Sequence, residues 1–202
     1  MDYDLARLEA RFDNLPVVPR IFFALLAAER LRACCWAFAK SHNIEVSLYY
    51  AGCDLVFDHV IGDSKTSVER LEETTRFLDA IVPKSEDYGD CLATQAQEGL
   101  AALLCSMELW MVTAWGAHAN RGDPVEGFYA SSAVVNAIEH FDLFASESVH
   151  YPGRESDSSL LLDREIKWQS QLIDILEDQM VPRTKAPELR LLNRSFMVPP
   201  AV

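Results

Sequence analysis

The sequence has few basic residues for its size, and this scarcity argues against one large class of partner. It contains 18 Lys and Arg against 31 Asp and Glu, a formal net charge of -13. Residues 182–202 hold four basic residues and one acidic residue, so 14 basic and 30 acidic residues remain in 1–181, a net charge of −16. A body this acidic repels phosphate backbones, and its charge either keeps the protein in solution or attracts a basic partner. We therefore expect no nucleic-acid binding, and a basic protein becomes the favoured partner.

Long apolar runs and a leader segment are also missing. No apolar stretch approaches the roughly 18 residues that span a bilayer, and the N-terminal MDYDLARLEARFD is charged where a signal peptide would be apolar. The five cysteines are odd in number and form no Cys-x-x-Cys pair, which favours buried, reduced thiols. These absences predict a soluble, cytoplasmic protein with no membrane association.

Recognisable catalytic motifs are absent as well. The sequence has no P-loop, no Gly-x-Gly-x-x-Gly and no Gly-x-Ser-x-Gly, and its five histidines form no His-x-x-x-His or His-Glu-x-x-His pair. The adjacent Cys34 and Cys35 lie among apolar residues. Apolar surroundings raise the pKa of a thiol and so disfavour redox chemistry. The sequence thus predicts no cofactor and no catalytic residue, so an enzyme is the less favoured class.

The composition and the pattern of the sequence are typical of a helical protein. Half of its residues are hydrophobic and 24% are charged, so the chain can bury a real core, while strand-like alternation is scarce. We expect an all-α bundle of about seven helices as a single domain, 1–181, followed by a basic, Pro-containing tail, 182–202, that is loose or laid across the acidic body. The central helix should be Leu92–His118, which is apolar on nearly every face. The others should cover about 3–13, 19–40, 45–61, 66–82, 124–150 and 158–181. The helix over 66–82 should be an outer one with a single buried stripe, because its apolar positions recur at alternating spacings of three and four: Val68, Leu71, Thr75, Leu78 and Val82.

A family resemblance follows from the order of these segments. The chain resembles the YjaG-like family, a bacterial domain family of unknown function, over roughly residues 10–180. The matching features are FFALLAAERLRACCWAF, CDLVFDHV, Pro83, QEGLAALL and EIKWQSQLIDILE. The resemblance implies an all-α fold and a cytoplasmic protein, and it implies no reaction.

Several acidic residues interrupt the apolar helical text. Carboxylates from facing helices can build a metal site in the core of a bundle, but the Glu-x-x-His pattern of ferritin-like sites is absent. The same carboxylates can instead pair with arginines; Glu29 with Arg32 or Arg30 is one such pairing. Both interpretations stay open at this point. The candidate ligand or metal residues are Glu29, Asp54, Asp58, Glu98 and Glu139, with Glu108 a further acid of the same kind.

Two functional hypotheses result. The favoured one is a non-catalytic interaction module, like an immunity or regulatory protein, whose acidic surface engages a basic partner. The alternative is a metal- or small-molecule-binding helical bundle, possibly an enzyme, that uses the inward-facing carboxylates. A homodimer formed through an apolar helix face is compatible with either hypothesis.

Overall fold

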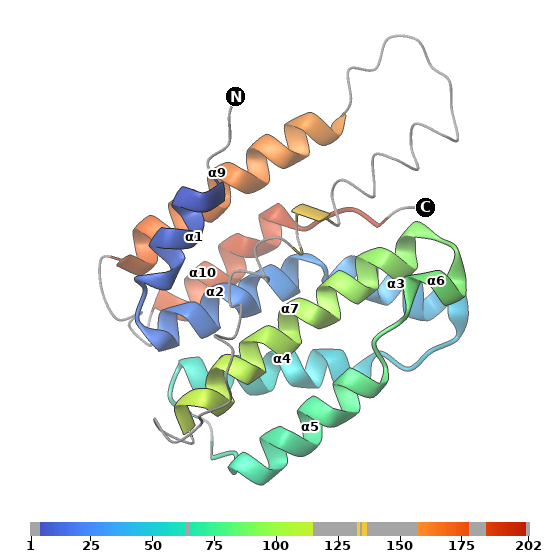
Figure 1. The fold of residues 1–202 in the computed structure, drawn as a ribbon, viewed down its shortest axis with the longest axis horizontal. Coiled ribbons are helices and arrows are strands. Elements are labelled where there is room, and N and C mark those ends of the chain that lie inside the picture. Colours follow the sequence, from blue (N-terminus) through green and yellow to red (C-terminus); the bar gives the residue numbers. More distant parts are fainter. Residues whose placement is uncertain are drawn as a thin grey trace.

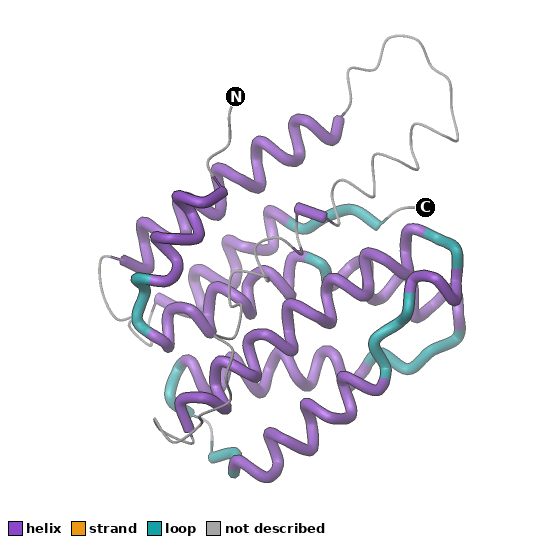
Figure 2. The backbone as a smooth tube through the Cα atoms, in the orientation of Figure 1, coloured by secondary structure: helices purple, strands orange, loops and turns teal. Residues whose placement is uncertain are grey.

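The expected all-α architecture is confirmed. The computed structural model describes residues 5–63, 65–114, 133, 135–136, 157–177 and 185–200, and these form helices and no strands (Figure 2). None of the helices in these ranges has both the length and the apolar character of a membrane span. The helices are α1 (Leu5–Asp13), α2 (Val17–Arg30), α3 (Arg32–His42), α4 (Ser47–Val60), α5 (Val68–Ala80), α6 (Ser85–Tyr88), α7 (Cys91–Ala114), α9 (Asp157–Glu177) and α10 (Lys185–Asn193), with a 3-10 turn η2 (Arg194–Phe196).

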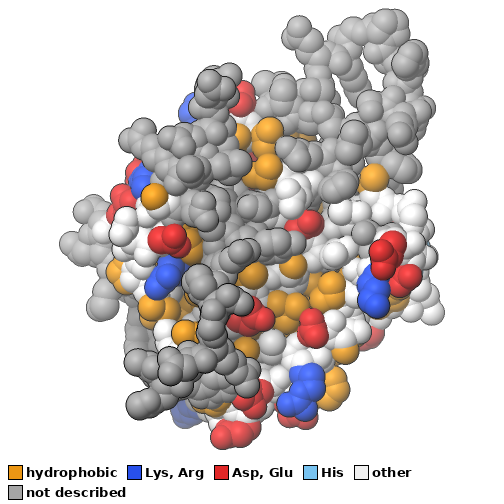
Figure 3. All heavy atoms as spheres, in the orientation of Figure 1, with side chains coloured by type: hydrophobic (Ala, Val, Ile, Leu, Met, Phe, Trp, Pro, Cys, Tyr) orange, Lys and Arg blue, Asp and Glu red, His pale blue; other side chains and the backbone are white. Residues whose placement is uncertain are grey.

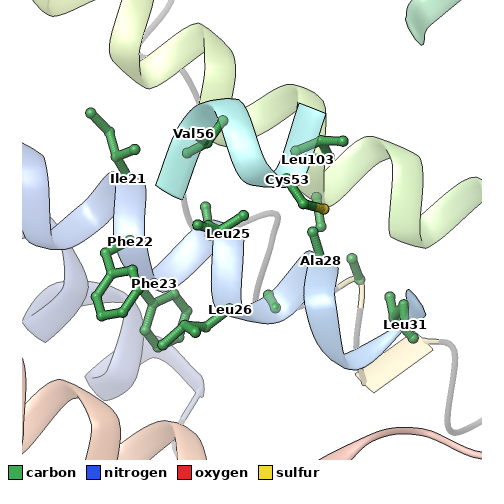
Figure 4. Packing of buried hydrophobic residues seen from close by; sticks show 14 of the residues in the cluster. Ile21, Phe22, Phe23, Leu25, Leu26, Ala28, Leu31, Cys53, Val56 and Leu103 are labelled. Atoms are coloured by element: carbon green, nitrogen blue, oxygen red, sulfur yellow. The ribbon is translucent and has the colours of Figure 1, made fainter. Parts of the chain in front are cut away.

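Helix α7 is central, as its apolar sequence predicts. It contacts α2, α3, α4, α5 and α6, and the other helices are arranged about it (Figure 1). Helix α2 is buried more completely, because residues 21–30 are all shielded from solvent. Its side chains meet those of α4 and α7 in one apolar cluster (Figure 4). The core is therefore built on two inner helices rather than one.

The expected helix over 19–40 is in fact two helices, and a distant contact explains the break. The Arg30 carbonyl, which a continuous helix would offer to Cys34, accepts a hydrogen bond from the Val198 N–H at 2.9 Å. Leu31 ends α2 with φ -91° and ψ 3°, and its N–H donates to the Ala28 carbonyl in a tight turn. The prediction of one continuous helix was wrong because the C-terminal segment occupies the carbonyl.

The outer helix α5 matches its predicted rhythm. Ser67 precedes it, and the Ser67 hydroxyl accepts a hydrogen bond from the Arg70 N–H at 3.3 Å, which caps the helix. Leu71 and Leu78 of the predicted apolar stripe are buried, whereas Phe77, outside the stripe, is 55% exposed.

The expected helix over 124–150 lies almost wholly outside the described residues. Residues 185–193, which belong to the expected tail, form α10 against α2.

Two glycines allow neighbouring helices to approach α7 closely. A Cβ at Gly99 of α7 would lie 2.6 Å from the Cys35 Sγ and 3.1 Å from the Leu31 Cβ. A Cβ at Gly52 of α4 would lie 3.0 Å from Leu103 of α7. The Gly52 that looks unfavourable for a helix in the sequence is therefore a packing requirement.

We predict that Gly99→Ala destabilises the protein by about 2 kcal/mol, since overpacking exceeds the gain of about 1 kcal/mol in helix propensity. The measurement is urea unfolding of the wild type, G99A, C35A and the double variant. Because the Cys35 Sγ is the nearest obstacle, C35A should relieve part of the G99A penalty. Simple additivity of the two single changes would contradict the proposed clash.

Candidate functional site

Two of the predicted acids meet at one arginine. Glu29 lies on α2, Asp54 lies on α4, and Arg190 reaches both from α10. The Arg190 Nε donates to the Glu29 Oε1 at 2.6 Å, and its Nη2 donates to the Asp54 Oδ1 at 2.6 Å. The guanidinium also lies over the Phe57 ring, 4.3 Å from its centroid, a distance typical of a cation–π contact. Three helices are thus joined by a single cation.

The two carboxylates of this triad differ in environment. Glu29 is buried and the Asp54 side chain is 63% exposed. Burial raises the pKa of Glu29, and the charge and hydrogen bond of Arg190 oppose that rise. The expected pairing of Glu29 with Arg32 or Arg30 is replaced by one with Arg190, a residue of the expected tail. As it stands, the triad is an ion network in which one guanidinium serves two carboxylates, and its Asp54 side faces solvent.

A second network lies deeper and surrounds Arg30. The Arg30 Nη2 is 2.8 Å from the Glu165 Oε1 of α9, and both side chains are almost fully buried. The Arg30 Nη1 and the Trp168 indole N–H donate to the Asn193 Oδ1 at 2.8 and 3.0 Å. The Asn193 amide in turn donates to the Leu26 carbonyl at 2.9 Å. Burial lowers the pKa of Arg30, and Glu165 opposes this by its charge.

The sequence does not mark Glu165 or Asn193 as site residues. Glu165 is one of several acids in α9, and nothing in the spacing marks it as the buried one. A signal was nevertheless present in Arg30 itself, because an arginine inside apolar helical text needs a buried partner. Only the packing of α9 and α10 against α2 shows which residues provide it.

The remaining candidate acids that the structure describes do not join the triad. Asp58 is exposed on α4. Glu98 is buried on α7, where its Oε1 accepts a hydrogen bond from the Asn136 Nδ2 at 3.3 Å. Glu139 lies outside the described residues. Within the described ranges no group of three or more His, Cys, Asp and Glu side chains could hold a metal ion, so these residues lend no support to the metal-binding alternative.

The cysteines divide into two environments. Burial is predicted from the sequence for all five cysteines; it is confirmed for Cys34, Cys35 and Cys53 and wrong for Cys91 and Cys105, which are partly exposed. None of the five forms a disulfide. Burial raises the pKa of Cys35 to about 12 and that of Cys53 well above its usual value. The three buried thiols are thus protonated and shielded at neutral pH.

We predict that two thiols, Cys91 and Cys105, react in the fast phase with an aromatic disulfide reagent under native conditions. The buried three should be protected until the structure opens. Peptide mapping by mass spectrometry after a short exposure identifies the labelled positions. Early labelling of Cys35 or Cys53 would be inconsistent with their burial.

The contribution of His59 of α4 to the stability of the protein depends on pH. Its ring stacks on Trp110 of α7, with centroids 4.0 Å apart and planes at 17°, and burial lowers the pKa of His59. The unfolded chain, with an ordinary pKa of about 6.5, binds the proton more readily than the folded one. The stabilising contribution of His59 is therefore complete above about pH 6.5 and is lost as the pH falls.

We predict that His59→Phe reduces the loss of stability between about pH 7 and pH 5, since Phe keeps the stacking and removes the titration. Urea unfolding at both pH values measures it in the wild type and in H59F. Equal pH dependence in the two proteins would assign the acid sensitivity to other groups.

Comparisons with known proteins place the fold but not the activity. No family model matches the chain, and no curated protein matches it. A DUF416 family protein from Shewanella baltica OS155, solved by crystallography, has a similar fold, with a TM-score of 0.70 over 96% of each chain. The two sequences are 12% identical over this alignment. The likeness therefore concerns the fold, which this chain shares with a member of an uncharacterised family.

Proposed function

We propose that this protein is a non-catalytic interaction module, immunity- or regulator-like, whose acidic surface binds a basic protein partner. One observation carries the proposal. Residues 54–90, from the second half of α4 to the start of α7, contain ten acidic and four basic residues, and none of the ten acidic side chains is buried. Figure 3 shows Asp and Glu side chains over the part of the view where α5 runs.

The net negative charge of residues 54–90 attracts a positively charged partner before the two surfaces touch. Like charges gathered on one side of a protein steer an oppositely charged partner and raise its association rate. Glu108 of α7 belongs to the same side, because the charge of Asp79 on α5 adds to burial in raising the Glu108 pKa. Binding of this kind should weaken steeply as salt is added.

Three further parts of the proposal rest on the fold and the sequence together. We propose membership of the YjaG-like family, which the segment order and a fold shared with another uncharacterised family support. A cytoplasmic location fits the reduced cysteines. A homodimer is compatible with the exposed apolar side chains of α10, and light scattering at micromolar concentration tests it.

The experiment compares two doubly neutralised variants of equal net charge. E73Q/D79N removes charge from the acidic segment, and D163N/E188Q removes the same charge from exposed positions of α9 and α10. The wild type and the control should retain a basic partner at about 0.01 M salt and release it at about 1 M, where the Debye length falls to about 3 Å. E73Q/D79N should retain markedly less. Equal retention by both variants, or capture that salt leaves unchanged, would contradict the proposal.

A further inference from the structure

The C-terminal segment covers a polar surface of the inner helices. We call residues 185–200, which comprise α10, η2 and the four residues after it, the strap. Figure 1 shows α10 running beside α2, and the two helices are in contact. Beneath the strap lie Glu29, Arg30 and Gln95, polar side chains that are buried in an otherwise apolar core.

The contacts of the strap are polar along its whole length. Arg190 holds the Glu29 and Asp54 carboxylates at one end. Asn193 in the middle accepts hydrogen bonds from Arg30 and Trp168. At the far end the Val198 N–H donates to the Arg30 carbonyl at 2.9 Å, and the Gln95 amide donates to the Pro199 carbonyl at 3.3 Å.

The apolar attachment of the strap is small by comparison. Its buried apolar side chains are Ala186, Leu189 and Val198, and Phe196 stacks on Trp168 with centroids 4.3 Å apart. Several large apolar side chains of the strap face outward instead: Leu191 is 65% exposed, Leu192 47% and Met197 36%.

The fit of the strap on α9 is also incomplete. A small cavity lies beside the direct contacts of Trp168 with Asn193 and Phe196, and it is lined by Leu161, Arg164 and Glu165 on one side and by strap residues 196–198 on the other. Polar contacts exchange readily for contacts with water, whereas buried apolar area does not. Segments held in this way open separately from the rest of a domain.

We propose that the strap releases from the folded bundle as a unit and that Arg190 competes internally with the basic partner. Release leaves the Arg30–Glu165 pair within the bundle, because Arg30 belongs to α2 and Glu165 belongs to α9, and neither helix is part of the strap. It frees Asp54, which already belongs to the acidic surface of residues 54–90, from its cation, and it adds the Glu29 carboxylate to that surface. This competitor role rests on the proposed function, and the release of the strap does not.

Cys34 provides a reporter of release that the chain already carries. Its Sγ lies 3.5 Å from the Val198 carbonyl oxygen and 3.7 Å from that of Pro199, so the strap covers it. Cys35 lies instead against α7, with its Sγ 3.8 Å from the Ala96 carbonyl oxygen. Opening of the strap exposes Cys34 and leaves Cys35 covered.

The first test measures alkylation of the full chain by mass spectrometry, position by position, after Cys91 and Cys105 have reacted. Cys34 should react faster than Cys35. Arg190→Ala should accelerate Cys34 about tenfold or more, the usual consequence of losing charged hydrogen bonds, without accelerating Cys35. Arg11→Ala, which breaks an exposed pairing of α1 with Asp174 and Glu177 of α9, is the control and should leave the Cys34 rate unchanged. One common rate for Cys34 and Cys35, or equal acceleration of both by R190A, overturns the release.

The second test measures binding of an oligoarginine peptide at low salt. R190A and R11A each remove one positive charge, so the difference between them isolates the position of that charge. R190A should bind the peptide several-fold more tightly than R11A. Equal affinities overturn the competitor role. If no protein binds the peptide while Cys34 still reacts first, the proposed function fails and the release of the strap is supported.

Discussion

Replacing Arg30 with methionine should lower the free energy of unfolding by about 3–5 kcal/mol, the usual cost of breaking a buried ion pair by removing one partner. The Arg30 side chain is fully buried and lies 2.8 Å from Glu165. The variant leaves the Glu165 carboxylate in the core without its cation, and it also removes one donor to Asn193. Urea unfolding followed by circular dichroism provides the measurement.

Two further variants separate the ion pair from simple loss of volume. R30M/E165M replaces both charges with apolar groups, and it should recover much of the R30M loss because no unpaired charge is left in the core. R11M breaks the solvent-exposed pairs with Asp174 and Glu177 and should cost no more than about 1 kcal/mol. A loss in R30M as small as that in R11M would mean that water reaches the Arg30 site.

Replacing Phe23 with alanine should cost about 3–5 kcal/mol, the range found for large-to-small changes at buried aromatic positions. Phe23 is fully buried on α2, and its ring meets the Phe12 ring of α1 edge to face, with centroids 5.3 Å apart. The change removes this contact and leaves a cavity between α1 and α2. The same unfolding measurement applies.

Phe77→Ala is the matched control, because it makes the same chemical change on the outer helix α5. The Phe77 ring is 55% exposed, so its loss should change the free energy of unfolding by about 0.5 kcal/mol or less. Comparable losses at the two positions would contradict the arrangement of inner and outer helices. Together with the Arg30 variants, this pair tests the apolar and the polar parts of the core separately.

The candidate site depends both on the local sequence pattern and on contacts between residues that are distant in the chain. Glu29 and Asp54 stand out in the sequence as acids in apolar helices, and the structure brings them together. Their common partner, Arg190, is 136 residues from Asp54 in the chain. Spacing along a helix relates residues three or four apart, so it carries no information about such a pairing.

The sequence by itself determined the helical class, the central position of α7 and the buried stripe of α5. These follow from the local period of apolar residues, which the chain carries whatever its neighbours are. Only the tertiary structure decided that α2 ends at Arg30, that Gly52 and Gly99 are points of close approach, and that Arg30 pairs with Glu165. Each of these features depends on a contact with a carbonyl, a side chain or a helix that is distant in the chain. Packing of the whole bundle determines these contacts, because the partner of a buried polar group, or the neighbour of a closely packed helix, is close in space and not in sequence.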